Sequence, residues 1–187
     1  MRRNIFAALM IISLLLCGCG GRGEEKRFEQ FQSELASASE IRVEAELTAD
    51  YGDSARAYTL TMTWTPDGCE VEVLRPELIA GIKAHIDENG SDLEFDGLIL
   101  DTGELTGDGL TPISALPRLL ETMTEGHIDS AWKEGDSVVV ELTPDDVISL
   151  SLWMEKETMA PSRAELQGQD SGRVLITCEI TRFEYTP

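Results

Sequence analysis

The sequence predicts a mainly β fold of the α+β class, in which about ten antiparallel strands form a curled half-barrel sheet with two helices on its concave side. The first observation is that most of the chain alternates apolar and polar residues in short runs separated by turn signals. The second is that two segments repeat apolar residues at steps of three or four, as amphipathic helices do. The third is physical: a long, twisted antiparallel sheet tends to curl, and the helices must bury their apolar faces against it.

The first helix is expected over Glu25–Ser37, where Phe28, Phe31 and Leu35 recur at helical spacing. The period then changes from three or four residues to two. In the segment Ile41–Leu47, apolar residues alternate with charged ones, as they do in a half-buried strand. A helix followed directly by a strand is therefore the expected start of the domain.

Two further strands are expected next, joined to Ile41–Leu47 and to each other by short turns. Tyr58–Trp64 alternates large apolar residues with threonines and is the most regular strand of the sequence, and Cys69–Leu74 follows it. The turns are Tyr51-Gly52-Asp53 and Pro66-Asp67-Gly68, because proline presets φ and glycine supplies a positive φ. Short turns between alternating segments predict an antiparallel meander.

A second helix is expected over Thr111–Glu125, with Thr111 as its N-cap and Pro112 at its first helical position. Pro117 leaves open a split of this helix after one turn, because proline removes a backbone donor inside a helix. The further predicted strands are Ile79–Ile86, Asp92–Leu100, Ile128–Trp132, Ser137–Leu142, Val147–Met154, Met159–Gln167 and Gly172–Tyr185.

The chain is strongly acidic, with 15 Lys and Arg residues against 35 Asp and Glu residues among 187, a formal charge of −20. Removal of Arg2 and Arg3 with a signal peptide changes this charge to −22. Such a charge argues against binding to nucleic-acid phosphates or anionic lipid headgroups. The length and the apolar content of 42% support one folded domain with a substantial core.

The N-terminus reads as a lipoprotein signal peptide over residues 1–18. Arg2 and Arg3 precede an apolar stretch, Ile5–Leu16, that is too short to span a bilayer as a helix. The segment Leu16-Cys17-Gly18-Cys19 resembles a bacterial lipobox, in which the Cys is diacylated and becomes the new N-terminus. Cys19 fits the lipidated position better than Cys17, and an ordinary secretory signal remains the alternative.

These features give the expected domain organisation and location. Residues 19–26 are the lipidated Cys and a short polar, glycine-rich tether, and residues 27–187 are a single domain. Two acyl chains on one Cys suffice for stable anchoring. We therefore expect the domain on the outer, extracytoplasmic face of the cell membrane, with the membrane as its first partner through the lipid anchor.

Two cysteines besides Cys19 lie in the predicted domain, Cys69 and Cys178. An extracytoplasmic compartment permits a disulfide between them. Both also occupy apolar positions of predicted strands, which suits buried free thiols. The sequence leaves the two interpretations equally open.

Several segments together resemble one superfamily. They are Pro-Glu-Leu-Ile-Ala-Gly-Ile at 76–82, Leu-Asp-Thr-Gly at 100–103, the inserted helix, and Trp153–Glu165, where Glu155 or Lys156 stands at a position that is more usually Asp. Over about Phe28–Tyr185 this order resembles the LolA-like superfamily of lipoprotein carriers and RseB-type sensors. It is most similar to single-domain lipoproteins of Gram-positive spore formers, including the GerS-type germination lipoproteins. The resemblance implies a concave apolar cavity for an acyl chain or a partner protein, without enzyme activity or a cofactor.

Large, adaptable apolar residues are the candidates for lining such a cavity, and each is also a candidate for ordinary core. Two functions follow. The first is a non-enzymatic module that binds an acyl chain, a lipoprotein or an apolar segment in its cavity. The second is a scaffold whose cavity is filled by its own helices and which docks and stabilises a wall-remodelling envelope enzyme. The candidate cavity residues are Met62, Trp64, Trp132, Trp153 and Met154.

No catalytic or metal site is expected. Asp101-Thr102-Gly103 resembles an aspartic-protease motif, but that chemistry needs a second carboxylate to share a proton. Asp170-Ser171-Gly172 follows a polar segment and reads as a hairpin turn, so a protease using Asp101 is a remote alternative. His85 and His127 are the only histidines, and both are expected on the solvated surface without a metal.

Overall fold

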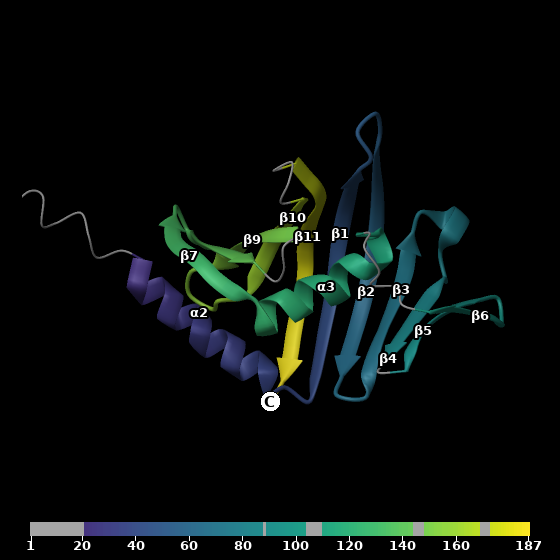
Figure 1. Cartoon of the computed structure of the whole chain (residues 1–187), viewed down its shortest axis with the longest axis horizontal. Helices are drawn as coiled ribbons and strands as arrows, with labels where there is room; N and C mark the ends of the chain where they lie inside the picture. Colours follow the sequence, from purple (N-terminus) through teal and green to yellow (C-terminus); the bar gives the residue numbers. More distant parts are fainter. Residues whose placement is uncertain (1–20, 88, 104–109, 144–147, 169–172) are drawn as a thin grey trace, which may run out of the picture.

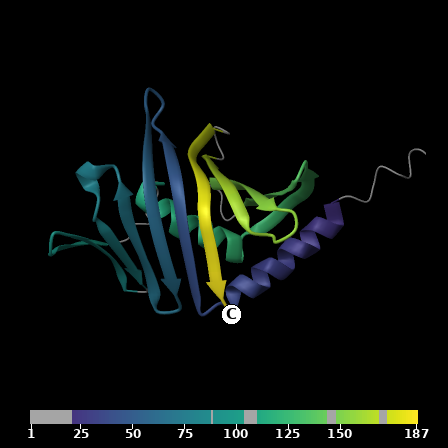
Figure 2. The same ribbon diagram turned by 180° about the vertical axis from the view of Figure 1, so that it is seen from behind.

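The computed structural model describes residues 21–87, 89–103, 110–143, 148–168 and 173–187. Within these residues one antiparallel sheet of eleven strands holds the whole domain together, and two helices lie on the same side of it (Figures 1 and 2). The sheet order is β6-β5-β4-β3-β2-β1-β11-β10-β9-β8-β7, so the last strand closes beside the first. The strands are β1 (Glu40–Asp50), β2 (Ala55–Thr65), β3 (Gly68–Arg75), β4 (Lys83–Asp87), β5 (Gly90–Phe95), β6 (Leu98–Gly103), β7 (His127–Glu134), β8 (Ser137–Thr143), β9 (Ile148–Glu155), β10 (Pro161–Gly168) and β11 (Arg173–Thr186).

The two faces of the sheet differ because alternate side chains of a strand point to opposite faces. On β1 and β2 the register pairs Val43 with Met62 and Ala45 with Leu60, and all four side chains are buried. We call the face that carries them the inner face, and the opposite face the outer face. The inner face and the helices that cover it form the core, which continues across the sheet to Leu152 on β9.

The two helices, α2 (Gly21–Ala36) and α3 (Pro112–Glu125), cover the inner face. Helix α2 buries Phe28, Phe31 and Leu35 in the core and contacts β7, whereas α3 lies over β1, β2 and β3. The predicted fold class, a mainly β sheet with two helices on one side, is confirmed.

Helix α3 is continuous through Pro117, so the split that this residue left open does not occur. The predicted N-cap is present: the Thr111 hydroxyl accepts a hydrogen bond from the Ser114 backbone, and the Ser114 hydroxyl accepts one from the Thr111 backbone. This reciprocal cap and the burial of Leu116 and Leu119 stabilise the helix against the one missing backbone donor.

Two predicted strands were wrong in their bounds. The segment 92–100 is split by a tight turn, because Asp96 and Gly97 both have positive φ angles of 52° and 76°. The result is a hairpin of β5 and β6, which raises the strand number to eleven. In the segment 79–86, a short 3₁₀ helix (Glu77–Ile79) comes first, and the strand begins only at Lys83.

The start of the domain also differs from the prediction. Helix α2 begins at Gly21, four positions before the predicted Glu25, so most of the segment predicted as a tether is helical. The signal peptide, Cys17 and the lipidation candidate Cys19 lie outside the described residues. None of the helices in the described part of the chain is long and apolar enough to cross a membrane.

Candidate functional site

A pocket of about 500 Å³ opens on the inner face, beside the turn that joins the end of β2 to the start of β3. It lies between this turn, the end of β4, the last residues of α2, and the C-terminal half of α3. Its apolar lining comes from Leu35, Ile41, Trp64, Cys69, Ile86, Pro117 and Leu120.

The strand registers bring Trp64 to this place. Ile41 pairs with Trp64, Trp64 with Cys69, and Cys69 with Ile86, so four neighbouring strands each contribute an inner-face residue to the pocket. Trp64 follows Leu60 and Met62 on the same face, but unlike them it is only half-buried. It therefore forms a wall of the pocket where the continuous core ends.

The turn that borders the pocket depends on Gly68. Its φ is +145°, and a Cβ at this position would lie 2.7 Å from the carbonyl oxygen of Ile86. The Thr65 hydroxyl donates a hydrogen bond of 3.3 Å to the carbonyl oxygen of Gly68 and closes the turn. Glycine is required here because the β2–β3 turn approaches the end of β4 closely.

The rim of the pocket is acidic. Four exposed carboxylates line it: Asp67, Asp87, Glu121 and Glu125. The nearby thiol adds no charge, because burial raises the pKa of Cys69 to about 11 and keeps it protonated at neutral pH. Arg118 partly compensates one of these charges, because its guanidinium lies 2.9 Å from Glu121, but the rim as a whole is negative and repels anions.

The five predicted cavity residues separate into three groups. Met62 and Met154 are 2% and 0% exposed and belong to the core. Trp64 lines the pocket. Trp132 and Trp153 lie on the outer face, so their prediction as lining of an inner cavity was wrong.

The outer-face position of the two tryptophans follows from strand phase. The buried neighbours of the two tryptophans are Ala131 on β7 and Leu152 and Met154 on β9, and a residue adjacent to a buried one points to the opposite face. Trp132 and Trp153 are both paired with Val139 of β8, and the Arg163 guanidinium lies 5.0 Å from the Trp153 ring centre.

Cys69 and Cys178 are free thiols. They lie on β3 and β11, which are three positions apart in the sheet, so strand spacing alone separates them by at least about 14 Å. A disulfide requires Cα atoms within about 7 Å, so the bridge that the sequence left open is not formed. Burial, with a smaller effect of Glu179, raises the pKa of Cys178 to about 12.

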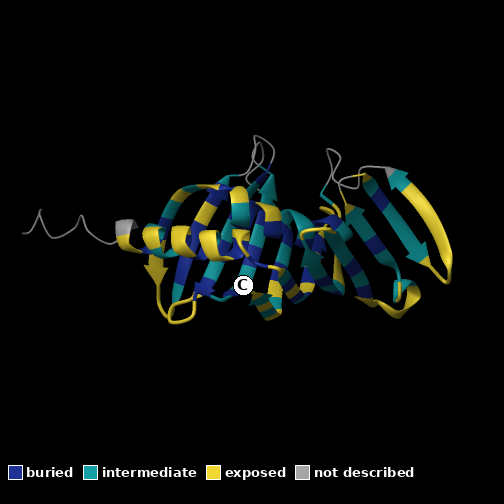
Figure 3. Ribbon diagram, turned by 90° about the horizontal axis from the view of Figure 1, so that it is seen from below, coloured by how far each residue is buried: buried dark blue, intermediate teal, exposed yellow. Residues whose placement is uncertain are grey.

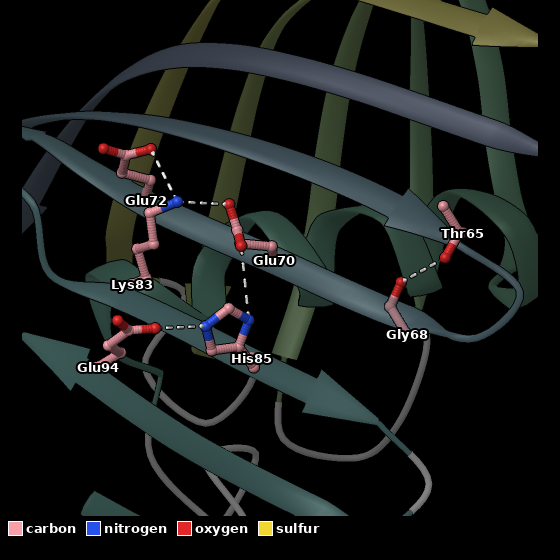
Figure 4. A network of polar contacts seen from close by, with 7 residues as sticks. All are labelled: Thr65, Gly68, Glu70, Glu72, Lys83, His85 and Glu94. Atoms are coloured by element: carbon pink, nitrogen blue, oxygen red, sulfur yellow. Dashed lines mark hydrogen bonds and ion pairs between the residues drawn. The ribbon is translucent and has the colours of Figure 1, made fainter. Parts of the chain in front are cut away.

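A charged network covers the outer face of β3, β4 and β5 (Figure 4). The Lys83 ammonium lies 3.1 Å from Glu70 and 3.7 Å from Glu72. The two ring nitrogens of His85 each lie 3.5 Å from a carboxylate, one from Glu70 and one from Glu94. The hydrogen bond and charge of Glu70 raise the pKa of Lys83.

This network is a solvated surface feature, as predicted for His85. Its members are partly exposed, and ion pairs of this kind contribute little to stability. Among the described residues, no group of three or more His, Cys, Asp or Glu side chains is arranged to hold a metal ion.

Asp101, the remote protease candidate, is exposed on β6 and lies across the ladder from Asp92. Proton sharing between two catalytic carboxylates needs a site shielded from water, which an exposed edge position does not offer. The second candidate motif, Asp170-Ser171-Gly172, lies outside the described residues.

Sequence reasoning missed one surface. Leu98, Ile99 and Leu100 on β6 are 76%, 70% and 65% exposed, at one end of the sheet (Figure 3). The available signal was a run of three apolar residues directly after Asp96-Gly97, where a half-buried strand would alternate.

Comparison with known proteins places the fold. No protein-family model and no curated protein sequence matches the chain. A DUF1329 family protein from Desulfovibrio piger is similar in structure, with a TM-score of 0.50 and 11% identity over 85% of this chain and 90% of that chain. A LolA superfamily protein from Nitrosomonas europaea has a TM-score of 0.44 and 12% identity, covering 84% and 93% of the two chains.

A third similar structure is a chain of the complex between the CwlD amidase and the GerS lipoprotein from Clostridioides difficile. Its TM-score is 0.43 and its identity is 19%, covering 87% of this chain and 95% of that chain. At these identities the likeness concerns the fold alone. The likeness to the DUF1329 family protein supports the overall fold, and the LolA superfamily protein and the chain of the GerS complex resemble this chain at lower TM-scores.

Proposed function

We propose that this chain is a membrane-anchored extracytoplasmic binding module without enzyme activity, and that its pocket at Trp64 holds an acyl chain. The observation that carries the proposal is the pocket itself. Its volume of about 500 Å³ lies within the range of about 300–1,000 Å³ that is usual for ligand pockets, and its interior is apolar.

The rim defines the kind of ligand. Asp67, Asp87, Glu121 and Glu125 would face the head of a chain that enters the pocket. A carboxylate or phosphate head would meet like charges there, whereas a neutral or cationic head would not. We infer that the pocket prefers a neutral acyl chain, such as an acylglycerol or the acyl part of a lipoprotein, over a free fatty acid.

Membrane anchoring through Cys19 is part of the same proposal. Cys19 comes two positions before Gly21, where α2 begins, so anchoring would hold the folded domain at the extracytoplasmic surface by a very short connection. The strongly acidic domain would be repelled by anionic headgroups and would stand away from them.

Native mass spectrometry of the protein extracted from membranes in mild detergent tests the ligand. The expected result is a bound species with the mass of a neutral acyl lipid, beyond the mass of the anchor. Ala36→Trp should block the pocket, because Ala36 is exposed and lies on its lining.

Ser33→Trp is the matched control, since Ser33 is exposed on the same helix but does not line the pocket. The bound lipid should be lost in Ala36→Trp and kept in Ser33→Trp. Lipid that is absent from the wild type, or equally present in both variants, would contradict binding in this pocket.

A second role, docking of an envelope partner protein, is favoured by a different observation. The exposed apolar residues of β6 lie at the sheet edge, where one strand, β5, separates them from the β4 residues that line the Trp64 pocket. In this role the chain is a scaffold that holds an envelope enzyme, with the helices filling most of the inner face.

A further inference from the structure

Among the described residues, no further strand lies beside β6, and this edge of the sheet is unusually apolar. Leu98 and Leu100 point to the inner face and Ile99 to the outer face, and all three are more than half exposed. Phe95, across the ladder from Leu98, is also 47% exposed. An edge strand with exposed apolar residues is a template for pairing with another strand.

The opposite edge of the same sheet, β7, is protected. Helix α2 packs against β7, and the Lys133 ammonium on this strand lies 3.0 Å from a carboxylate oxygen of Glu24 on the helix. A covering helix and a charged side chain are devices that prevent edge pairing. The sequence of β6, Leu-Ile-Leu-Asp-Thr-Gly, contains neither a lysine nor a proline. The two edges of the sheet are therefore built differently.

The hairpin register shows which backbone groups face outward. Asp96 and Gly97 form a two-residue turn, so Phe95 and Leu98 are the hydrogen-bonded pair that closes it. The next pair, Glu94 and Ile99, is then non-hydrogen-bonded. The N–H and C=O of Ile99 therefore point away from β5, toward the position of an added strand.

Charge limits what can occupy this edge. The hairpin 90–103 contains four acidic residues and no Lys, Arg or His. Two copies of this chain joined at β6 would bring eight carboxylates together, because each hairpin contributes four. Anionic lipid headgroups would be repelled for the same reason. A basic segment with alternating apolar residues fits both the charge and the exposed side chains.

We propose that β6 is a docking site for an extended, basic segment of a partner protein, which adds to the sheet as a further strand. Apolar side chains of this segment would pack on Leu98 and Leu100, and its basic side chains would meet the acidic outer side of the hairpin. The proposal gives the second proposed role, partner docking, a specific surface and a class of partner.

The position of β6 in the domain also suits contact with a protein that lies outside the membrane. Helix α2, which follows the anchor candidate Cys19, begins at one end of the long axis of the domain, and β6 lies at the other end (Figures 1 and 2). If the anchor holds the first end at the membrane, the β6 edge is directed away from it.

The test uses the full chain in detergent and a short, end-blocked peptide of alternating valine and lysine. Amide NMR spectra should show the largest shifts at β6 and new protection of the Ile99 amide from exchange, and added salt should weaken binding. A peptide with glutamate in place of lysine is the charge control and should not bind.

Ile99→Pro removes the outward donor without removing a hydrogen bond to β5, and should weaken peptide binding about tenfold. If Ile99→Pro is poorly folded, Leu100→Lys takes its place, because a lysine at this exposed position should repel the basic peptide. The folding of both variants is checked by thermal unfolding. Ile99→Thr keeps the donor and the strand preference, and should weaken binding less.

Three results would overturn the proposal. They are equal binding of the glutamate peptide, unchanged binding in folded Ile99→Pro and Leu100→Lys, or occupation of β6 by a second copy or by vesicles, seen in sedimentation. Because the Ala36→Trp experiment probes the pocket, its outcome is independent of these results. Failure at β6 would leave the acyl-chain proposal standing.

Discussion

Replacement of Trp64 by alanine distinguishes a pocket wall from ordinary core. Truncation of a fully buried aromatic residue costs about 3–5 kcal/mol, through lost burial and the cavity left behind. Trp64 is only partly buried and borders a pocket of about 500 Å³, so part of its surface has no packing partner to lose. Because most of its surface is nevertheless buried against the core, we expect a loss at the lower end of this range, about 3 kcal/mol, in the free energy of unfolding.

Met62→Ala is the internal comparison. Met62 lies on the same strand and face but is 2% exposed, and its truncation should cost about 2–5 kcal/mol. Trp64→Ala should therefore lower the free energy of unfolding by no more than Met62→Ala does, although tryptophan is the larger side chain. Urea unfolding followed by circular dichroism measures both, since this signal does not depend on tryptophan. A loss of about 4 kcal/mol or more for Trp64→Ala would refute the pocket-wall interpretation.

Four further predictions concern individual side chains. Cys19→Ala should move the protein from the membrane to the soluble fraction, and release by Cys17→Ala instead would show that the wrong Cys was chosen. Asp101→Asn should leave the cellular phenotype intact; loss of the phenotype with an unchanged melting curve would revive protease chemistry. Cys69 and Cys178, with pKa values of about 11 and 12 against an ordinary 9.0, should resist a thiol reagent at pH 8 until the protein unfolds. Since folding keeps both thiols protonated, stability should be intact below pH 9 and fall as the pH rises from 9 toward 12, measured by urea unfolding.

Much of the fold could be predicted because local signals agreed with the tertiary structure. The alternation in Tyr58–Trp64 and the turn at Pro66-Asp67-Gly68 gave the β2–β3 meander, and Thr111 gave the start of α3. The turn at Asp96-Gly97 was missed because apolar residues flank it on both sides, so a single strand was predicted there.

The site was less predictable, for two different reasons. The phase of β9 contained enough information to place Trp153 opposite Met154, so its assignment to the cavity was avoidable. The pocket itself depends on how Leu35 of α2 and Leu120 of α3 approach the β2–β3 turn. These segments are far apart in the chain, and no local pattern encodes the gap between them.

The measurement that tests the central claim most directly is fluorescence quenching by a neutral acyl chain carrying bromine. The chain has three tryptophans, and Trp132→Phe with Trp153→Phe removes the two on the outer face. Trp64 then reports alone, from the pocket wall. We predict saturable quenching by a brominated acylglycerol and much weaker quenching by the corresponding fatty acid, whose head would meet the acidic rim. Unchanged Trp64 emission at high concentrations of the neutral chain would contradict an acyl-chain pocket at this site.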